Sequence, residues 1–322
     1  MYGLKQAGII YHQASVKHLA QFGYHPVRFT LGIWQNDTQE TFFTLVVDDF
    51  AIQYTSLRNS KHLLNALKTK YGISEDQEAN IYIGILLKWD YAQRNVDLST
   101  PGYITAALLR FRHMSPIIHK YSPHRHVAYT YGAAVQYTTP ENDHPLLPTY
   151  ILKYIQQVVG ILLYYGIAIN KTILVALGNI AAKQSHATLT TIEKTNQLLD
   201  YLESKPHATT RYHASGTILF IHSDESYLSV SKSCSRASGV FFISDTKPDA
   251  LKFSEYTPLL NGFIFVLCKI LHNIMASADE AKYGALFLNG QEDVLVQTTL
   301  IEMNQPQPPS PSQVNNFTAV VI

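Results

Sequence analysis

Residues 41–54, "TFFTLVVDDFAIQY", decide the fold expected for the first third of the chain. Two runs suited to buried strands, Thr41 to Val47 and Phe50 to Tyr54, flank the adjacent acids Asp48 and Asp49. The pattern predicts a β-hairpin with two carboxylates at its turn. Taken alone, the acids favour an ordinary solvated turn, because Asp is common in turns. The functional alternative is a site whose carboxylate oxygens hold Mg²⁺ or Mn²⁺.

Helical and strand patterns alternate around this hairpin. Residues 11–22 predict a short helix, and residues 60–71 predict an amphipathic helix with Ser60 as its N-terminal cap. Residues 81–90, "IYIGILLKWD", predict one further strand. Helices packed on a small sheet are therefore expected, in a mixed α+β or α/β arrangement.

The predicted secondary structure changes twice along the rest of the chain. Helical patterns follow an irregular, Pro- and His-rich stretch, and one helix is predicted to start with a capping box between Thr190 and Glu193. Three short strands, at 217–221, 239–243 and 262–268, then precede a helix at about 277–288. These changes predict four segments, namely 1–112, 113–149, 150–206 and 207–322.

Composition excludes several classes of protein. The chain has 25 Lys and Arg against 24 Asp and Glu, so its net charge of +1 neither indicates nor excludes a polynucleotide partner. Two cysteines exclude a disulfide framework and a cysteine-rich zinc site. The longest apolar run, Val158 to Ile169, is shorter than a membrane span, and no signal peptide is recognisable. An intracellular protein without a membrane segment is expected.

Several motifs in the first 112 residues resemble one known family. "MYGLKQA" (1–7), "VVDDF" (46–50), "YIGILL" (82–87) and "GYITAALLRF" (102–111) resemble the reverse transcriptase of copia-type retrotransposons. The resemblance implies a partial palm over residues 1–112 and a helical thumb over residues 150–206. It also implies that Asp48 and Asp49 bind catalytic Mg²⁺ or Mn²⁺. Lys5 and Gln6 are then expected to contact nucleic acid or nucleotide.

The last segment carries a second resemblance. "IHSDESYLSVSKSCSRASGVFFIS" (221–244) and "MASADEAKYGALF" (275–287) resemble the ribonuclease H domain that follows this polymerase. The resemblance implies a ribonuclease H-like mixed sheet with helices, truncated at its C-terminus, over residues 207–322. It assigns metal binding to Asp224, expected at a strand end, and to Glu280 on the next helix. The alternatives are a turn cap for Asp224 and a solvated helix face for Glu280.

The sequence departs from this family at several positions. Val46 stands where the polymerase motif has Tyr, and Asn315 stands where the ribonuclease H motif has its third Asp. The fingers and a further palm Asp would lie before Met1, and the remaining ribonuclease H strands and fourth acid would follow Ile322. We therefore expect a polyprotein fragment that is inactive as written, with RNA, DNA, RNA–DNA hybrids and the rest of the polyprotein as partners.

Two alternatives to this expectation stay open. One is an enzyme that is active only within a longer polyprotein. The other is a host-retained nucleic-acid-binding or interaction protein that kept the fold and lost the chemistry. A zinc site at His113, His119 and "HRH" (124–126) is not expected, because no Cys, Asp or Glu lies between His113 and Val127. That stretch predicts a polar loop.

Overall fold

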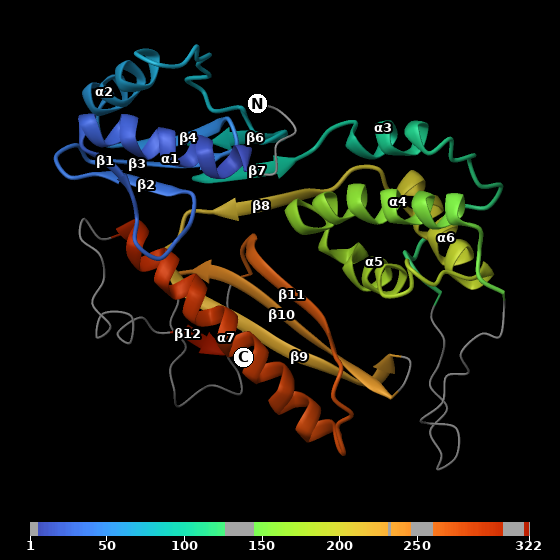
Figure 1. Ribbon diagram of the computed structural model, residues 1–322. Coiled ribbons are helices and arrows are strands. Elements are labelled where there is room, and N and C mark those ends of the chain that lie inside the picture. The colour runs from blue at the N-terminus through green and yellow to red at the C-terminus, as the bar shows by residue number, and fades with distance from the viewer. Residues whose placement is uncertain (1–5, 126–144, 231–232, 246–259, 305–318, 322) are drawn as a thin grey trace. The chain divides into compact units, whose positions relative to one another are not determined.

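The computed structural model describes residues 6–125, 145–230, 233–245, 260–304 and 319–321 (Figure 1). These residues form two compact units. The first consists of the described residues up to Leu87 together with Glu292 to Asn304, and the second of Lys88 to Gln291 together with residues 319–321. Both units contain helices and antiparallel strands, so the protein is of the α+β class.

A four-stranded antiparallel sheet is the centre of the first unit, with strand order β1-β2-β3-β4. Its strands are β1 (Tyr24–Pro26), β2 (Ile33–Asn36), β3 (Thr41–Val46) and β4 (Asp49–Tyr54). Two helices, α1 (Ala7–Leu19) and α2 (Leu57–Lys68), pack against it, and a short 3-10 helix, η1 (Ala20–Phe22), connects α1 to β1. Figure 1 shows both helices beside this sheet.

One apolar core joins the sheet to its two helices. Phe43 of β3 is 1% exposed, whereas its neighbours Phe42 and Thr44 are only half-buried. The Phe43 ring stacks on Trp34 of β2, with 5.5 Å between centroids and 15° between planes. Alternate side chains of a strand point to opposite faces, so this burial pattern is that of a sheet with one covered face. The other fully buried members of the cluster are Leu19, Tyr24, Leu63, Ala66 and Leu67.

The α2 helix begins earlier than the sequence pattern predicts. Ser56 is its N-cap, and the Ser56 hydroxyl accepts a hydrogen bond from the Asn59 backbone N–H at 3.3 Å. Ser60 is buried inside the helix. The prediction that Ser60 caps this helix is therefore wrong. Two serines one turn apart offer the same capping chemistry, and only the extended backbone at Ser56 distinguishes them.

Residues 81–90 form two strands where one was predicted. β5 (Ile81–Tyr82) pairs antiparallel with the start of β6 (Ile85–Asp90). Ile83 and Gly84 have φ angles of 46° and 79°, which is the backbone of a tight two-residue hairpin turn. The single-strand prediction is wrong because the turn lies inside an uninterrupted apolar run. β6 continues past Leu87 into the second unit.

The second unit contains a helical region. Its helices are α3 (Tyr103–Arg110), α4 (Thr149–Ala168), the short 3-10 helix η2 (Lys171–Ile173), α5 (Leu174–Ala181) and α6 (Leu189–Ser204). Two strands flank this region in the sequence, β7 (Asn95–Ser99) and β8 (Thr209–His213), and they pair antiparallel. The capping box of α6 joins Thr188 and Thr191, so the predicted pair of Thr190 and Glu193 is wrong by two residues.

By length and composition alone, α4 is the one described helix that could cross a membrane. It begins at Thr149 and has 20 residues, so it extends well before the apolar run that starts at Val158. One such helix is weak evidence, because the core helix of a soluble protein meets the same criterion. Ile155 and Leu162 on one side of α4 are at most 1% exposed within the protein.

The C-terminal sheet of the second unit has the strand order β11-β10-β9-β12. β9 (Ile218–Val230), β10 (Cys234–Ser244) and β11 (Phe263–Leu271) are antiparallel, and β12 (Ala319–Val321) runs parallel to β9. Each of the first three strands extends beyond the predicted apolar run, because the polar residues at its ends still pair with the neighbouring strand. The helix α7 (Ala278–Asn304) begins close to the predicted start and continues past the predicted end at 288.

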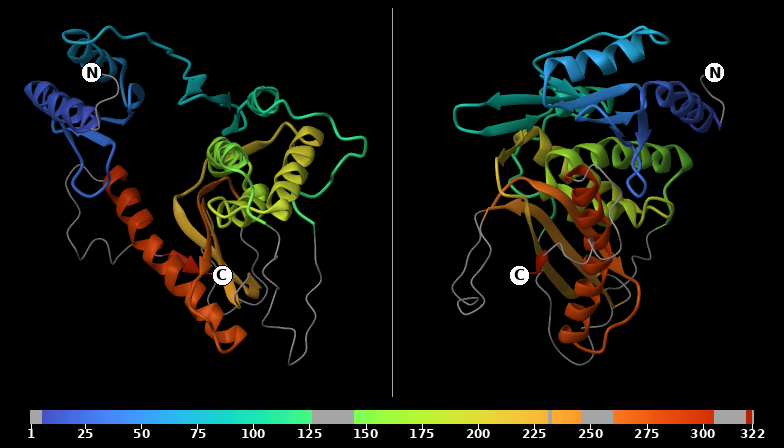
Figure 2. Two further views of the ribbon diagram at one scale, coloured as in Figure 1. Left: turned by 45° about the vertical axis from the view of Figure 1, so that its right-hand side comes forward. Right: turned by 90° about the vertical axis from the view of Figure 1, so that its left-hand side faces the viewer.

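Each face of this sheet carries a helix. Ala285 of α7 belongs to one buried cluster with Ala237 and Leu267, and Figure 2 shows α7 running along the sheet. The residue of β10 that precedes Ala237, Arg236, points to the opposite face, where it donates a hydrogen bond of 2.6 Å to the Asn179 side chain of α5. The sheet is therefore covered by α7 on one side and by α5 on the other.

Candidate functional site

The tip of the β3–β4 hairpin carries the first pair of predicted acids. Val46 pairs with Asp49, so the turn consists of Val47 and Asp48 alone. Val47 has a φ of 58°, in the left-handed region, and its side chain is 79% exposed. A positive φ at the first central residue suits the hairpin turns that match the twist of the strands, but Gly is the residue usually found there.

Val47 is under backbone strain. The left-handed conformation costs an L-residue about 1–2 kcal/mol, and for a β-branched side chain it is rare. Burial does not compensate this cost, since the Val47 side chain lies mostly in solvent. Strained residues of this kind gather at functional sites. Ile83, in the β5–β6 turn, is another β-branched residue with a positive φ, so the two hairpin turns share this strain.

Asp48 and Asp49 are both exposed at this tip. Burial raises the pKa of Tyr11 in α1, a hydrogen bond from Ser15 lowers it, and the charges of Tyr71 and then Asp48 add smaller rises. Within the described part of the chain, neither carboxylate pairs with a cation. Adjacent, solvated and unpaired carboxylates are able to bind a hydrated divalent cation.

The two predicted nucleic-acid contacts, Lys5 and Gln6, lie about 40 residues before this tip in the sequence. Gln6 is exposed and occupies the N-cap position of α1, where its side chain makes no capping hydrogen bond. Lys5 lies outside the described residues, as does Asn315. The structure therefore places Gln6 at a helix start, and its contact with a ligand stays a prediction.

Asp224 lies in the middle of β9, although a strand end was predicted. It pairs with Ser238 of β10 and is exposed. The preceding residue, Ser223, accepts a hydrogen bond of 2.8 Å from the Asn289 amide of α7, so Ser223 points toward that helix. Because neighbouring strand residues alternate, Asp224 points to the opposite face, away from α7.

Glu280 lies in the first turn of α7 and takes part in helix capping. Its carboxylate accepts a hydrogen bond from the Ala276 backbone N–H, while the Ser277 hydroxyl accepts one from the Glu280 backbone N–H at 3.1 Å. A carboxylate here also complements the helix dipole. Asp224 therefore points to the side of β9 opposite α7, the helix that carries Glu280.

Sequence reasoning missed polar groups at the contact between α7 and the sheet. Asn289 is fully buried and donates to both Ser223 and the Ser238 carbonyl, but its Oδ1 has no hydrogen-bond partner among the described atoms. Glu225, on the same strand face as Ser223, also has one buried oxygen, Oε2, without such a partner. An acid directly after Asp224 was visible in the sequence, but its orientation toward α7 required the strand register.

The histidine-rich stretch packs against α6 over the part that the structure describes. His113 Nε2 lies 2.8 Å from an Asp200 carboxylate oxygen, and His119 Nδ1 lies 3.2 Å from the Ser204 hydroxyl. His126 lies outside the described residues. Across the described ranges, no group of three His, Cys, Asp or Glu side chains is arranged to hold a metal ion.

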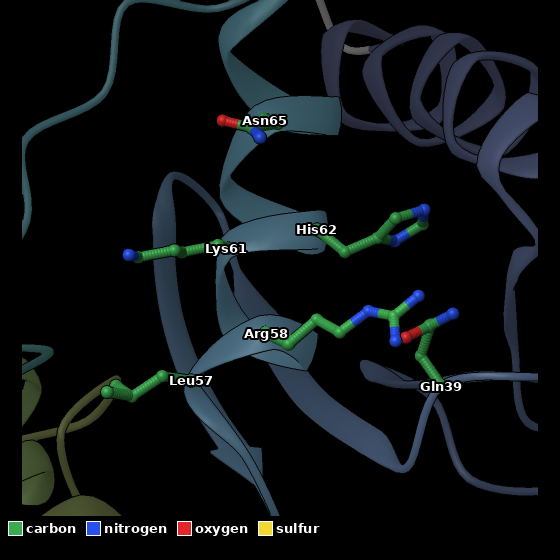
Figure 3. Close-up of a pocket in the computed structure, with 6 residues that line it drawn as sticks. All are labelled: Gln39, Leu57, Arg58, Lys61, His62 and Asn65. Carbon is green, nitrogen blue, oxygen red and sulfur yellow. The ribbon is translucent and has the colours of Figure 1, made fainter.

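A basic hollow lies on the first unit, on the surface of α2 (Figure 3). Its volume is about 480 Å³, and we call it the α2 hollow. It is lined by Gln39, Leu57, Arg58, Lys61, His62 and Asn65. Sequence reasoning assigned no role to these residues. The available signal was the spacing of the polar residues 58, 61, 62 and 65, which places them on one side of a helix, opposite its apolar stripe.

The four predicted acids thus lie in two different units. Asp48 and Asp49 are held together in the first, whereas in the second Asp224 points away from α7, the helix that carries Glu280. Comparison with protein-family models finds no match to this chain, and comparison with curated proteins finds none either.

Proposed function

We propose that the chain is part of a copia-type retrotransposon polyprotein that binds RNA, DNA and their hybrids and does not synthesise DNA by itself. In this proposal residues 1–112 are a partial reverse transcriptase palm and residues 150–206 a thumb-like helical region. Residues 207–322 are then a ribonuclease H-like domain. The motifs around Asp48 and Asp224 support the assignment, as does the mixed C-terminal sheet with a helix on each face.

The observation that carries this proposal is the pair of adjacent, exposed carboxylates of Asp48 and Asp49 at the hairpin tip. An ordinary turn requires no second acid. The second acid has a reason if the tip serves to present two carboxylates to a cation beside a nucleic acid. Asp48 and Asp49 fit a hydrated Mg²⁺ or Mn²⁺, because their oxygens are hard ligands open to solvent. When bound, such an ion would neutralise charge on a phosphate group.

Binding without DNA synthesis follows from the number of ligands. Phosphoryl transfer requires the metals and both reacting groups to be held in place together. In the part of the chain that the structure describes, no third His, Cys, Asp or Glu completes a metal-holding group with Asp48 and Asp49. Two carboxylates hold a cation loosely and leave a nucleotide unplaced. We therefore propose weak divalent-cation binding at this tip.

The same reasoning applies to the ribonuclease H-like sheet. Two-metal hydrolysis of a nucleic acid needs carboxylates that converge on metal ions about 3.5–4 Å apart. Asp224 points away from α7, the helix that carries Glu280, and Glu280 is engaged as a helix cap. We propose that this sheet does not cut an RNA–DNA hybrid efficiently.

The test measures cation binding and turnover separately. Titration with Mn²⁺, followed by electron paramagnetic resonance of the free ion, is expected to reveal a weak site that D48N/D49N loses. The matched control D37N/E40Q removes two acids from the β2–β3 loop of the same unit and is expected to retain that site. Equal Mn²⁺ binding by all three proteins would overturn the proposed cation site.

Turnover is measured by primer extension on an RNA template and by cleavage of a labelled RNA–DNA hybrid, each with Mg²⁺ and with Mn²⁺. Neither product is expected above background. Primer extension that disappears in D48A would overturn the proposal of binding without synthesis. Hybrid cleavage that disappears in D224A would overturn the proposal for the second acid pair.

A further inference from the structure

The α2 hollow is separate from the acids of the hairpin tip. α2 follows β4 directly, so its N-terminal turn lies at the end of the sheet where β4 finishes and β3 begins. Gln39, which also lines the hollow, comes two residues before β3. β3 separates this end from the Asp48 turn by about 17 Å, at roughly 3.4 Å per residue. A ligand in the hollow therefore occupies a different site from a cation at the tip.

Two cations at the hollow are available to a ligand. Arg58 and Lys61 are both exposed, and within the described ranges neither forms an ion pair. Two other cations of the same helix region are engaged: Lys68 pairs with Glu75, and Lys70 donates to the Ala14 carbonyl at 3.1 Å. The chain carries a net charge of only +1, so a local pair of free cations matters more than the overall charge.

The geometry of the two cations favours a ligand with several anionic groups. Figure 3 shows the Arg58 guanidinium reaching toward Gln39 on one side of the helix, whereas the Lys61 ammonium extends to the other side. A chain of phosphates that crosses the helix offers an anionic group to each of these two cations.

His62 and Asn65 supply further hydrogen-bonding groups in the lining of the hollow. His62 Nδ1 lies 2.9 Å from the hydroxyl of Tyr24, which is fully buried. When that hydroxyl donates to Nδ1, the ring proton sits on Nε2 and is available as a donor. The buried tyrosine thus holds the imidazole in one orientation, and Asn65 lies one turn further along the same helix.

The lining also distinguishes between classes of anionic partner. Among the described residues that line the hollow, Leu57 is the one apolar side chain, and none is Phe, Tyr or Trp. A membrane-binding face needs several apolar side chains to insert among lipids, and recognition of bases needs stacking rings. Cations with amide and imidazole donors instead match phosphate oxygens, which such side chains contact without reading sequence.

We propose that the α2 hollow binds the phosphodiester backbone of a polynucleotide, with Arg58 and Lys61 contacting successive phosphates. The binding is independent of base sequence and requires no divalent cation. It deepens the proposed function by placing nucleic acid on α2, and it depends on that function only for the identity of the natural polynucleotide.

The test uses the full chain and a fluorescein-labelled oligodeoxythymidine, with anisotropy measured from low to high NaCl. R58Q/K61Q is expected to weaken binding roughly tenfold at low salt and to reduce the slope of log K against log salt by roughly 1.4, for two lost contacts to a single strand. K17Q/R28Q removes the same charge from the same unit outside the hollow, and less than a threefold change is expected.

Equal losses in the two double variants, or no loss in R58Q/K61Q, would overturn the proposal. Two competitors distinguish the ligand class. Polyglutamate that displaces the oligonucleotide at matched charge would assign the hollow to acidic polypeptides, and inorganic phosphate that displaces it at millimolar concentration would assign it to a small anion. D48N/D49N is expected to bind the oligonucleotide like the parent chain in the absence of divalent cation. Failure at the hollow and failure of the proposed cation site are therefore distinguishable.

Discussion

The two acidic regions of the molecule differ in how their carboxylates come to lie where they do. Asp48 and Asp49 are consecutive residues at a hairpin tip, so the covalent chain keeps them close once the hairpin forms. Asp224 and Glu280 belong to a strand and a helix that are joined by a long segment, and their meeting depends on the strand register. A shift of one residue moves every side chain of a strand to the other face.

This difference explains why a family resemblance predicts the relative positions of Asp48 and Asp49 more directly than those of Asp224 and Glu280. Ser223 contacts α7, so Asp224, one position later, points away from it. The exposure of Asp48 and Asp49 does not depend on such an alternation, because both lie at the hairpin turn. A sequence motif is therefore enough to predict a site made of adjacent residues. A site shared by a strand and a helix also depends on the strand register, which decides the face to which each side chain points.

The largest expected effect concerns the support beneath the hairpin. F43A removes a ring that is 1% exposed and stacks on Trp34, so the first unit should lose about 3–5 kcal/mol of unfolding free energy. Urea unfolding followed by Trp34 fluorescence measures this loss. F42A removes the same ring from the opposite face of β3 and should cost only about 1–2 kcal/mol. Equal losses would mean that β3 does not have one covered face.

The next effect tests the register that separates Asp224 from α7. A Cβ added at Gly239 would lie 1.8 Å from Asn289 Oδ1, so G239A should destabilise the contact between α7 and the sheet by about 1–3 kcal/mol. Hydrogen exchange of peptides from β10 and α7 reports this change. G160A, where a Cβ meets nothing within 4 Å, is the control and should not accelerate exchange.

Asn289 provides a further check on this register. N289A in the G239A background should recover part of the lost protection, because the clash disappears while two hydrogen bonds are also lost. Normal protection in G239A alone would contradict the observed packing of α7 on β10, and with it the orientation of Asp224.

A smaller effect with a defined pH dependence is expected at Tyr24. Y24F removes the hydrogen bond to His62 and should cost about 1 kcal/mol at neutral pH. Burial raises the pKa of Tyr24 to about 12, above its usual value of 10.0, so the folded state holds this proton more tightly than the unfolded state. The parent chain therefore loses stability as the pH rises from about 10 toward 12, and Y24F lacks this component.

Urea midpoints of the first unit at pH 8 and pH 11 test this prediction. The difference between parent and Y24F should shrink or reverse at the higher pH. A difference that is the same at both values would mean that the phenol is not buried in the folded state, and that His62 is not oriented by it.

The smallest effect is expected at the tip itself. V47G replaces a β-branched residue at a φ of 58° by the residue that adopts this conformation freely, so the first unit should gain about 0.5–1 kcal/mol. V46G, at the preceding strand position, should lose a similar amount because glycine weakens a strand. A lower urea midpoint for V47G than for the parent chain would contradict strain at the tip.

Local sequence patterns predicted which helices and strands form, but they missed several element boundaries that depend on the tertiary structure. The alternation in residues 41–54 located both strands of the hairpin, and the apolar stripe of residues 60–71 located α2. Helix starts at Ser56 and Thr188 were missed because neighbouring hydroxyl residues offer the same cap. The turn at Ile83 was missed because apolar residues occupy it.

The candidate sites divide in the same way. Asp48 and Asp49 were predicted as a candidate cation site because they are both acids and are consecutive in the sequence. The strain at Val47 is a backbone property that no composition reveals. The α2 hollow combines a helix face with Gln39 from a loop, so its existence as a concave surface required the tertiary structure.

Asn289 also makes this protein susceptible to deamidation whenever α7 unfolds. Gly290 follows Asn289, and a glycine offers no side chain to hinder attack of its backbone nitrogen on the asparagine amide carbon. In the folded protein the helix and the two hydrogen bonds of the amide hold these atoms apart. Each time α7 melts, the attack can expel ammonia, and hydrolysis then leaves aspartate or isoaspartate. A molecule altered in this way cannot restore the same contact with Ser223, so unfolding becomes irreversible with age.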